Sequence, residues 1–223
     1  MSRATYRYVT FHGIGDPPRA LDPGEDRVWV SRRQFVATLD AVADRPDVRI
    51  TFDDGNASDI VHALPELRRR GLHATFFVVA GRLGAPGFLS RDDVATLTAA
   101  GMTVGCHGMR HRAWRRLDDR ALSVELLDAR RLLEDIVQRP VREAACPFGA
   151  YDRRVLRSLR RYGYEHVYTS DRGAAPAGAF VQPRNSVGPS DGARVLEDIT
   201  GTGRRRAAVA MRRRAKLAAK HWR

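Results

Sequence analysis

Short segments rich in β-branched and aromatic residues alternate with longer amphipathic segments along most of the chain. Strands that alternate with helices indicate a parallel sheet, because each helix returns the chain to the edge where the next strand starts. About seven such units in a chain of this length predict an α/β fold, a small or incomplete (β/α)7-type barrel. The expected strands are Tyr6–Phe11, Val48–Phe52, Leu72–Ala80, Met102–Cys106, Glu143–Cys146 and Glu165–Thr169, with a further late strand near Gln182-Pro183-Arg184.

Residues that favour helix N-termini precede the amphipathic segments. The expected helices are one capped by Ser31, one from Ser58 or Asp59 to Arg70, one from Ser90 to before Gly101, a long one from about Asp118 to Gln138, and one over Asp152–Tyr162.

The net charge of +13 is concentrated at one end of the chain. Residues 201–223 contain nine Lys or Arg and no Asp or Glu, whereas the other 200 residues carry 30 basic and 26 acidic side chains. We therefore expect one domain over residues 1–200, followed by a basic, helix-compatible tail over 201–223. The tail could be a solvated segment, a phosphate-binding segment for nucleic acid, or a weak interfacial helix on an anionic membrane. The domain offers no nucleic-acid-binding fold, which favours peripheral membrane contact.

The first residues lack the apolar stretch of a secretory signal, and no window approaches the roughly 20 apolar residues of a membrane span. The two cysteines are then expected to remain reduced thiols. These features predict a cytoplasmic protein, and the basic tail suggests the inner membrane surface.

Polar clusters follow several of the expected strands. His12 follows the first strand, Asp53 and Asp54 the second, His107 the fourth and Pro147-Phe148-Gly149 the fifth. The C-terminal ends of parallel barrel strands meet on one face, where such enzymes carry their chemistry. The sequence therefore predicts that these clusters form one site.

Two adjacent carboxylates are ambiguous by themselves, because Asp is common in turns and helix caps. His107 and His111, four residues apart, could converge on one ion, and neutral imidazole suits zinc and related cations. At matching strand ends, the two clusters favour a metal site.

With these clusters the sequence resembles the polysaccharide deacetylase family (NodB homology, carbohydrate esterase family 4) over roughly residues 5–200. The family motif T-F-D-D-G is intact at residues 51–55, and the H-S/T-x-x-H motif matches at His107 and His111 with Gly108 in the Ser/Thr place. The R-x-P-F/Y-G motif survives as Pro147-Phe148-Gly149, with Ala145 where the family has Arg. The family's L-x-H motif near the C-terminus has no match.

The resemblance implies a NodB-like barrel that holds a divalent metal through Asp54, His107 and His111. Zinc is the first candidate for this metal. Asp53 would be the general base that takes a proton from water. The backbone N–H of Phe148, which follows Pro147, would be the oxyanion donor.

Two family residues need substitutes in this chain. For the family Arg, which orients the catalytic Asp, our candidate is Arg184, although a surface Arg is the simpler interpretation. For the missing last His, the general acid, our candidate is His12. The alternative for His12 is a buried or loop histidine hydrogen-bonded to backbone.

The function implied is metal-dependent hydrolysis of an N-acetyl or similar acyl group from a saccharide or lipid-linked sugar, in exopolysaccharide or capsule metabolism. Two alternatives stay open. One is a deformylase or amidase acting on another small N-acyl substrate, and the other is a non-catalytic domain that only binds carbohydrate.

Overall fold

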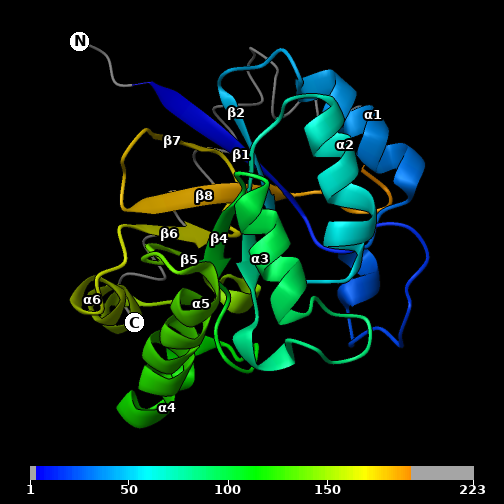
Figure 1. Ribbon diagram of the computed structural model, residues 1–223. Coiled ribbons are helices and arrows are strands. Elements are labelled where there is room, and N and C mark those ends of the chain that lie inside the picture. The colour runs from blue at the N-terminus through cyan, green and yellow to red at the C-terminus, as the bar shows by residue number, and fades with distance from the viewer. Residues whose placement is uncertain (1–3, 192–223) are drawn as a thin grey trace.

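Seven parallel strands form a closed barrel in the computed structural model, which describes residues 4–191 (Figure 1). The first strand pairs with the second along one edge and with the last along the other, so the ring is complete rather than open. The predicted (β/α)7-type barrel is therefore confirmed, and its "incomplete" variant is excluded. In ring order the strands are β1 (Thr5–Phe11), β2 (Val48–Phe52), β3 (Ala74–Val78), β4 (Thr103–Cys106), β5 (Glu143–Ala145), β6 (His166–Thr169) and β8 (Val181–Ser186).

One strand was not expected from the sequence. β7 (Ala174–Pro176) pairs antiparallel with Thr5–Arg7 at the start of β1, beside the point where β8 joins the same edge. Three residues of sequence Ala-Ala-Pro carry no alternating pattern and no β-branched side chain, so only the neighbouring backbone reveals this strand.

Helices cover the outside of the barrel (Figure 1). Ser31 accepts a hydrogen bond from the Gln34 N–H as expected, and Ser90 forms a capping box with Asp93. The helices are α1 (Arg32–Val42), α2 (Leu64–Arg69), α3 (Arg91–Ala99), α4 (Asp119–Ser123), α5 (Ala129–Val137) and α6 (Arg153–Arg161).

Two of the helical segments contain a π-helical turn. Asp59–Ala63 precedes α2, and Val124–Asp128 separates α4 from α5 within the expected long helix. The expected side-chain cap at Ser58 or Asp59 was wrong: Ser58 Oγ instead accepts from the Ile14 N–H at 3.2 Å. π-Helical turns occur often beside functional sites.

The main core lies between the outer face of the strands and the helices. Phe52 is fully buried there, with ring centroids 5.6 Å from Phe11 and 4.5 Å from Phe76. The opposite face of the same strands fills the barrel interior with Tyr8, Phe77, Ala145 and Tyr168. This alternation follows from the two-residue period of a strand, and it provides an aromatic layer beneath the strand ends.

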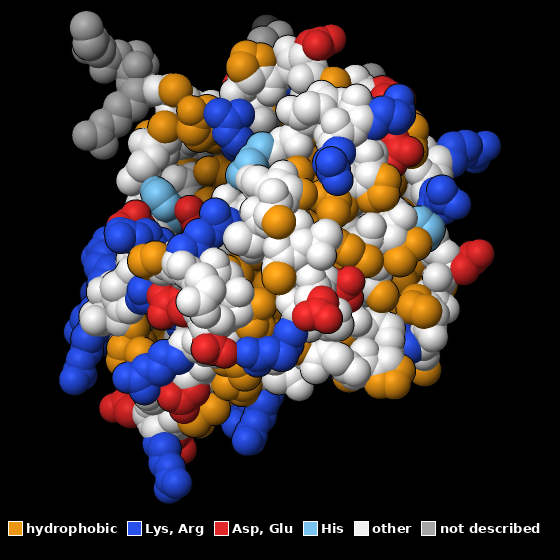
Figure 2. All heavy atoms as spheres, in the orientation of Figure 1, with side chains coloured by type: hydrophobic (Ala, Val, Ile, Leu, Met, Phe, Trp, Pro, Cys, Tyr) orange, Lys and Arg blue, Asp and Glu red, His pale blue; other side chains and the backbone are white. Residues whose placement is uncertain are grey.

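The outer helical surface is strongly charged. In the space-filling view, Lys and Arg side chains gather with acidic ones on the side of the molecule where α4, α5 and α6 lie (Figure 2). Among residues 4–191, no helix has the length and apolar character needed to cross a membrane. The boundary expected at residue 200 and the basic tail over 201–223 lie outside the described residues.

Candidate active site

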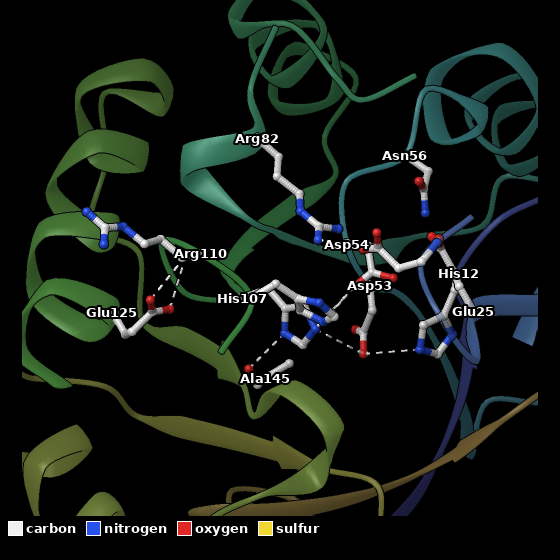
Figure 3. Close-up of polar contacts among 12 residues, drawn as sticks. His12, Glu25, Asp53, Asp54, Asn56, Arg82, His107, Arg110, Glu125 and Ala145 are labelled. Carbon is white, nitrogen blue, oxygen red and sulfur yellow. Dashed lines mark hydrogen bonds and ion pairs between the residues drawn. The ribbon is translucent and has the colours of Figure 1, made fainter. Parts of the chain in front are cut away.

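The polar clusters predicted to meet do meet, at the C-terminal end of the barrel strands (Figure 3). His12 directly follows β1, Asp53 and Asp54 follow β2, and His107 follows β4. Asp53, Asp54 and His107 are all at least 96% buried. The parallel barrel thus brings together side chains that are more than 90 positions apart in the sequence.

Asp54, His107 and His111 converge on one point. Asp54 Oδ1 lies 3.4 Å from His107 Nε2 and 3.2 Å from His111 Nε2, and the three potential ligand atoms are all within 4.8 Å of one another. Asp54 and His111 hold left-handed backbone conformations, with φ of 77° and 53°. Such conformations are unfavourable for residues other than glycine and are concentrated at functional sites.

The hydrogen bonds of these residues suit a cation. His107 Nδ1 lies 2.8 Å from the Ala145 carbonyl oxygen, which can only accept, so Nδ1 carries a proton and Nε2 is the ring nitrogen that faces Asp54. Asp54 Oδ1 is a buried atom without a hydrogen-bond partner in the described part of the chain. Burial would raise the pKa of Asp54, but the His107 and His111 imidazoles hold it well below its usual range. One carboxylate and two imidazole nitrogens form the mixed donor set that zinc and similar divalent ions accept.

Asp53 has a different partner, Arg184 of β8. The guanidinium donates from Nη1 to Oδ1 at 2.5 Å and from Nη2 to Oδ2 at 2.7 Å, a bidentate pair. Arg184 is 1% exposed, and its Cζ lies 5.0 Å from the Phe77 ring centroid above the interior aromatic layer. The alternative of a surface arginine was therefore wrong. Burial favours neutral Asp53, but Arg184 and His107 outweigh it and lower the pKa of this carboxyl.

His12 lies on the other side of Asp53 from His107. Its Nε2 is 3.9 Å from Asp53 Oδ2, the same distance as His107 Nε2 (Figure 3). His12 Nδ1 is buried and has no hydrogen-bond partner among the described residues. Burial lowers the pKa of His12 in spite of the nearby Asp54 and Asp53 carboxylates.

Phe148 forms the rim of the site beside His111. Its side chain is 69% exposed, and its ring centroid lies 4.6 Å from that of His111. Pro147 before it is buried, and Phe148 itself has a left-handed φ of 56°. An exposed aromatic ring in an unfavourable backbone conformation is a feature that packing alone does not explain.

Glu125 is a site neighbour that the sequence did not reveal. It is 1% exposed and accepts hydrogen bonds from the N–H groups of Met109 and Arg110, between the two histidines. In the sequence it is one acidic residue within an amphipathic helix, where solvent exposure is the usual interpretation. The structural feature that sets Glu125 apart is the π-helical turn over Val124–Asp128, and this turn could not be recognised in the sequence.

Comparison with known proteins agrees with the geometry. The family model described as "Polysaccharide deacetylase" matches residues 40–167, which is more than half of the chain. A relative from Bacillus subtilis (strain 168), named "Putative polysaccharide deacetylase YxkH", is 24% identical over 170 residues, which are 75% of this chain and 61% of that protein. The chain thus spans less than two thirds of the length of this curated relative.

Solved structures share the fold. The Streptococcus pyogenes deacetylase PplD in complex with acetate superposes with a TM-score of 0.78 at 20% identity, covering 90% of this chain and all of that one. The structure described as "putative polysaccharide deacetylase BA0330" from Bacillus anthracis gives a TM-score of 0.77 at 19% identity, covering 88% of this chain and 69% of that one. At these identities the likeness concerns the barrel itself. The match of the family model over residues 40–167 shows that the chain belongs to the polysaccharide deacetylase family.

Proposed function

We propose that this protein is a metal-dependent hydrolase that removes an N-acetyl or similar acyl group from a saccharide. The observation that carries the proposal is the division of labour between two adjacent carboxylates. Asp54 faces two imidazole nitrogens, whereas Asp53 is paired with Arg184. One carboxylate is placed to hold a cation and the other is left ionised to accept a proton.

Asp54, His107 and His111 would hold the divalent cation, with zinc the first candidate from the donor set. Such a cation, when bound, polarises an acyl carbonyl and raises the acidity of nearby water. Asp53 would take the proton from the attacking water, because the lowered pKa keeps it ionised at neutral pH. Arg184 holds both oxygens of the Asp53 carboxylate in a fixed orientation before the proton is transferred.

His12 and the Pro147-Phe148 turn would serve the other end of the scissile bond. His12 Nε2 lies 3.9 Å from Asp53 Oδ2, so its neutral ring could take up the proton that Asp53 has removed from water and would then deliver it to the leaving nitrogen. The backbone N–H of Phe148 would donate to the oxygen that becomes negatively charged, and its exposed ring offers an apolar surface for the face of a sugar.

The two alternatives predict different chemistry. A non-catalytic carbohydrate-binding domain would have no need for an ionised, oriented Asp53. The family arginine is replaced by Ala145 in this chain, but Arg184 pairs with Asp53 instead, which supports catalysis. A deformylase or amidase would use the same groups on a smaller acyl donor. We further propose a lipid-linked sugar on the inner membrane surface as substrate, in exopolysaccharide or capsule metabolism; its support is the basic composition of residues 201–223.

The test is acetate release from N-acetylglucosamine oligomers by the full chain, measured after chelation and after reloading with Zn²⁺. We expect activity that chelation removes and metal restores, and none in D53N at unchanged metal content. Metal binding without hydrolysis of any N-acyl sugar would support a binding domain. Formate release from N-formyl substrates alone would support a deformylase.

A further inference from the structure

The segment between the two histidines is held from both sides. From the β3 side, the Ala80 N–H donates to the Gly108 carbonyl at 2.9 Å and the Gly81 N–H donates to the Met109 carbonyl at 3.0 Å. From the helical side, Glu125 accepts from the Met109 N–H at 2.9 Å and from the Arg110 N–H at 3.2 Å (Figure 3). The carbonyls and the amides of this turn are thus fixed by separate elements.

The carboxylate of Glu125 is unusual in being almost wholly buried. Burying a charge is unfavourable unless strong hydrogen bonds replace its hydration. The two backbone N–H groups supply such charge-assisted bonds. Among the described ion pairs none involves Glu125, and its carboxylate accepts hydrogen bonds from the turn between the two histidines.

Gly108 and Glu125 fit one another. A Cβ atom on Gly108 would lie 2.4 Å from Glu125 Oε2, and the φ of Gly108 is +85°. A side chain at residue 108 would therefore collide with the Glu125 carboxylate unless one of them moved. The glycine at residue 108 leaves room for the buried acid at residue 125.

The consequence concerns His111. Its φ of 53° is unfavourable, so the turn must be held for its imidazole to face Asp54. Without Glu125, the Met109 and Arg110 amides lose their acceptor and the turn can relax toward an ordinary backbone conformation. Such a change would move His111 away from His107 and Asp54.

We propose that Glu125 is a positioning residue that holds His107 and His111 in the geometry for a divalent cation, an inference that rests on the proposed function. Supporting groups of this kind are typically worth about 10–100-fold in metal affinity.

The experiment is a Zn²⁺ titration of the full chain against a competing chromophoric chelator, alongside the thermal midpoint of the metal-free protein. We expect E125A to weaken Zn²⁺ binding by about 10–100-fold. E125Q keeps one acceptor oxygen and the same size, so it should recover most of the affinity. The matched control is E134A: Glu134 also accepts a backbone N–H, from Val141 at 2.9 Å, but lies on α5 away from the histidine turn. E134A should lower the thermal midpoint and leave Zn²⁺ affinity unchanged.

A double-mutant cycle tests the match between the two positions. G108S should also weaken binding, and in G108S/E125A the steric conflict is absent, so the combined loss should be smaller than the sum of the single losses. Additive losses would overturn the matching of Gly108 and Glu125.

E125A with wild-type Zn²⁺ affinity and a lowered thermal midpoint would overturn the positioning role. If E125A does not fold, G108S carries the test, and wild-type Zn²⁺ affinity in G108S would overturn the positioning role. A wild-type protein that takes up no divalent cation would instead overturn the proposed function.

Discussion

Removal of the Arg184 guanidinium tests the central electrostatic arrangement of the site. In R184M the side-chain volume is largely kept, but Asp53 becomes a buried carboxylate without a cation; wild-type Asp53 and Arg184 are 4% and 1% exposed. Breaking a pair this deeply buried costs about 3–5 kcal/mol, because the remaining charge is uncompensated. For a domain of this size that corresponds to a fall of about 6–20 °C in the thermal midpoint.

The loss should depend on pH. In the wild-type protein the pKa of Asp53 lies below its ordinary value, so the pair stabilises the fold above the unfolded-state pKa. That contribution is lost as the pH falls through the lower folded-state pKa. In the R184M variant, burial is the largest remaining effect on Asp53, and it raises the pKa of this carboxyl. The variant should therefore be most destabilised at neutral pH and should approach the wild type on acidification.

The assay is urea unfolding of chelator-treated protein between pH 4.5 and pH 8, with the folded fraction measured by circular dichroism. R142M is the control, because Arg142 pairs with Glu165 on the surface with both side chains more than half exposed. Its loss should stay within about 1 kcal/mol at every pH. R184M unfolding within about 1 kcal/mol of wild type at pH 7, with a pH-independent difference, would refute the reasoning.

Three further predictions concern single side chains. H12A should abolish acetate release while metal content stays at the wild-type level, and near-normal turnover would reject the assignment of His12. F148A should raise KM for N-acetylated oligosaccharides about fivefold, from the loss of about 1 kcal/mol of ring stacking, with little change in stability; unchanged KM would exclude a substrate contact. F52A should lower the free energy of unfolding by about 3–5 kcal/mol in urea titrations, since Phe52 is enclosed between Phe11 and Phe76, and a loss below about 1 kcal/mol would contradict that packing.

The strand pattern and the local motifs were enough to predict most of the fold and the group of residues that could hold a metal ion. Asp53, Asp54, His107 and His111 stand next to strand ends, so the barrel topology alone brings them together. The closure of the ring was less accessible, because pairing between β1 and β8 depends on residues at opposite ends of the domain.

The supporting residues were harder to predict, and for a physical reason. Arg184 reaches Asp53 across 131 positions, and in an arginine-rich sequence nothing local distinguishes it. We could propose Arg184 only because Ala145 stands where the family has the arginine that orients the catalytic Asp. Glu125 was not nominated at all, since its burial arises from a π-helical turn and from the space that Gly108 leaves.

The closed ring also sets the order in which the site can be completed during synthesis. The groups that would hold the cation belong to segments that follow β2 and β4, and these leave the ribosome well before β8. Asp53 gains its guanidinium only when β8 docks between β6 and β1. Without β8, Asp53 would therefore lack the guanidinium that orients it, so barrel closure and the orientation of this carboxylate are one structural event.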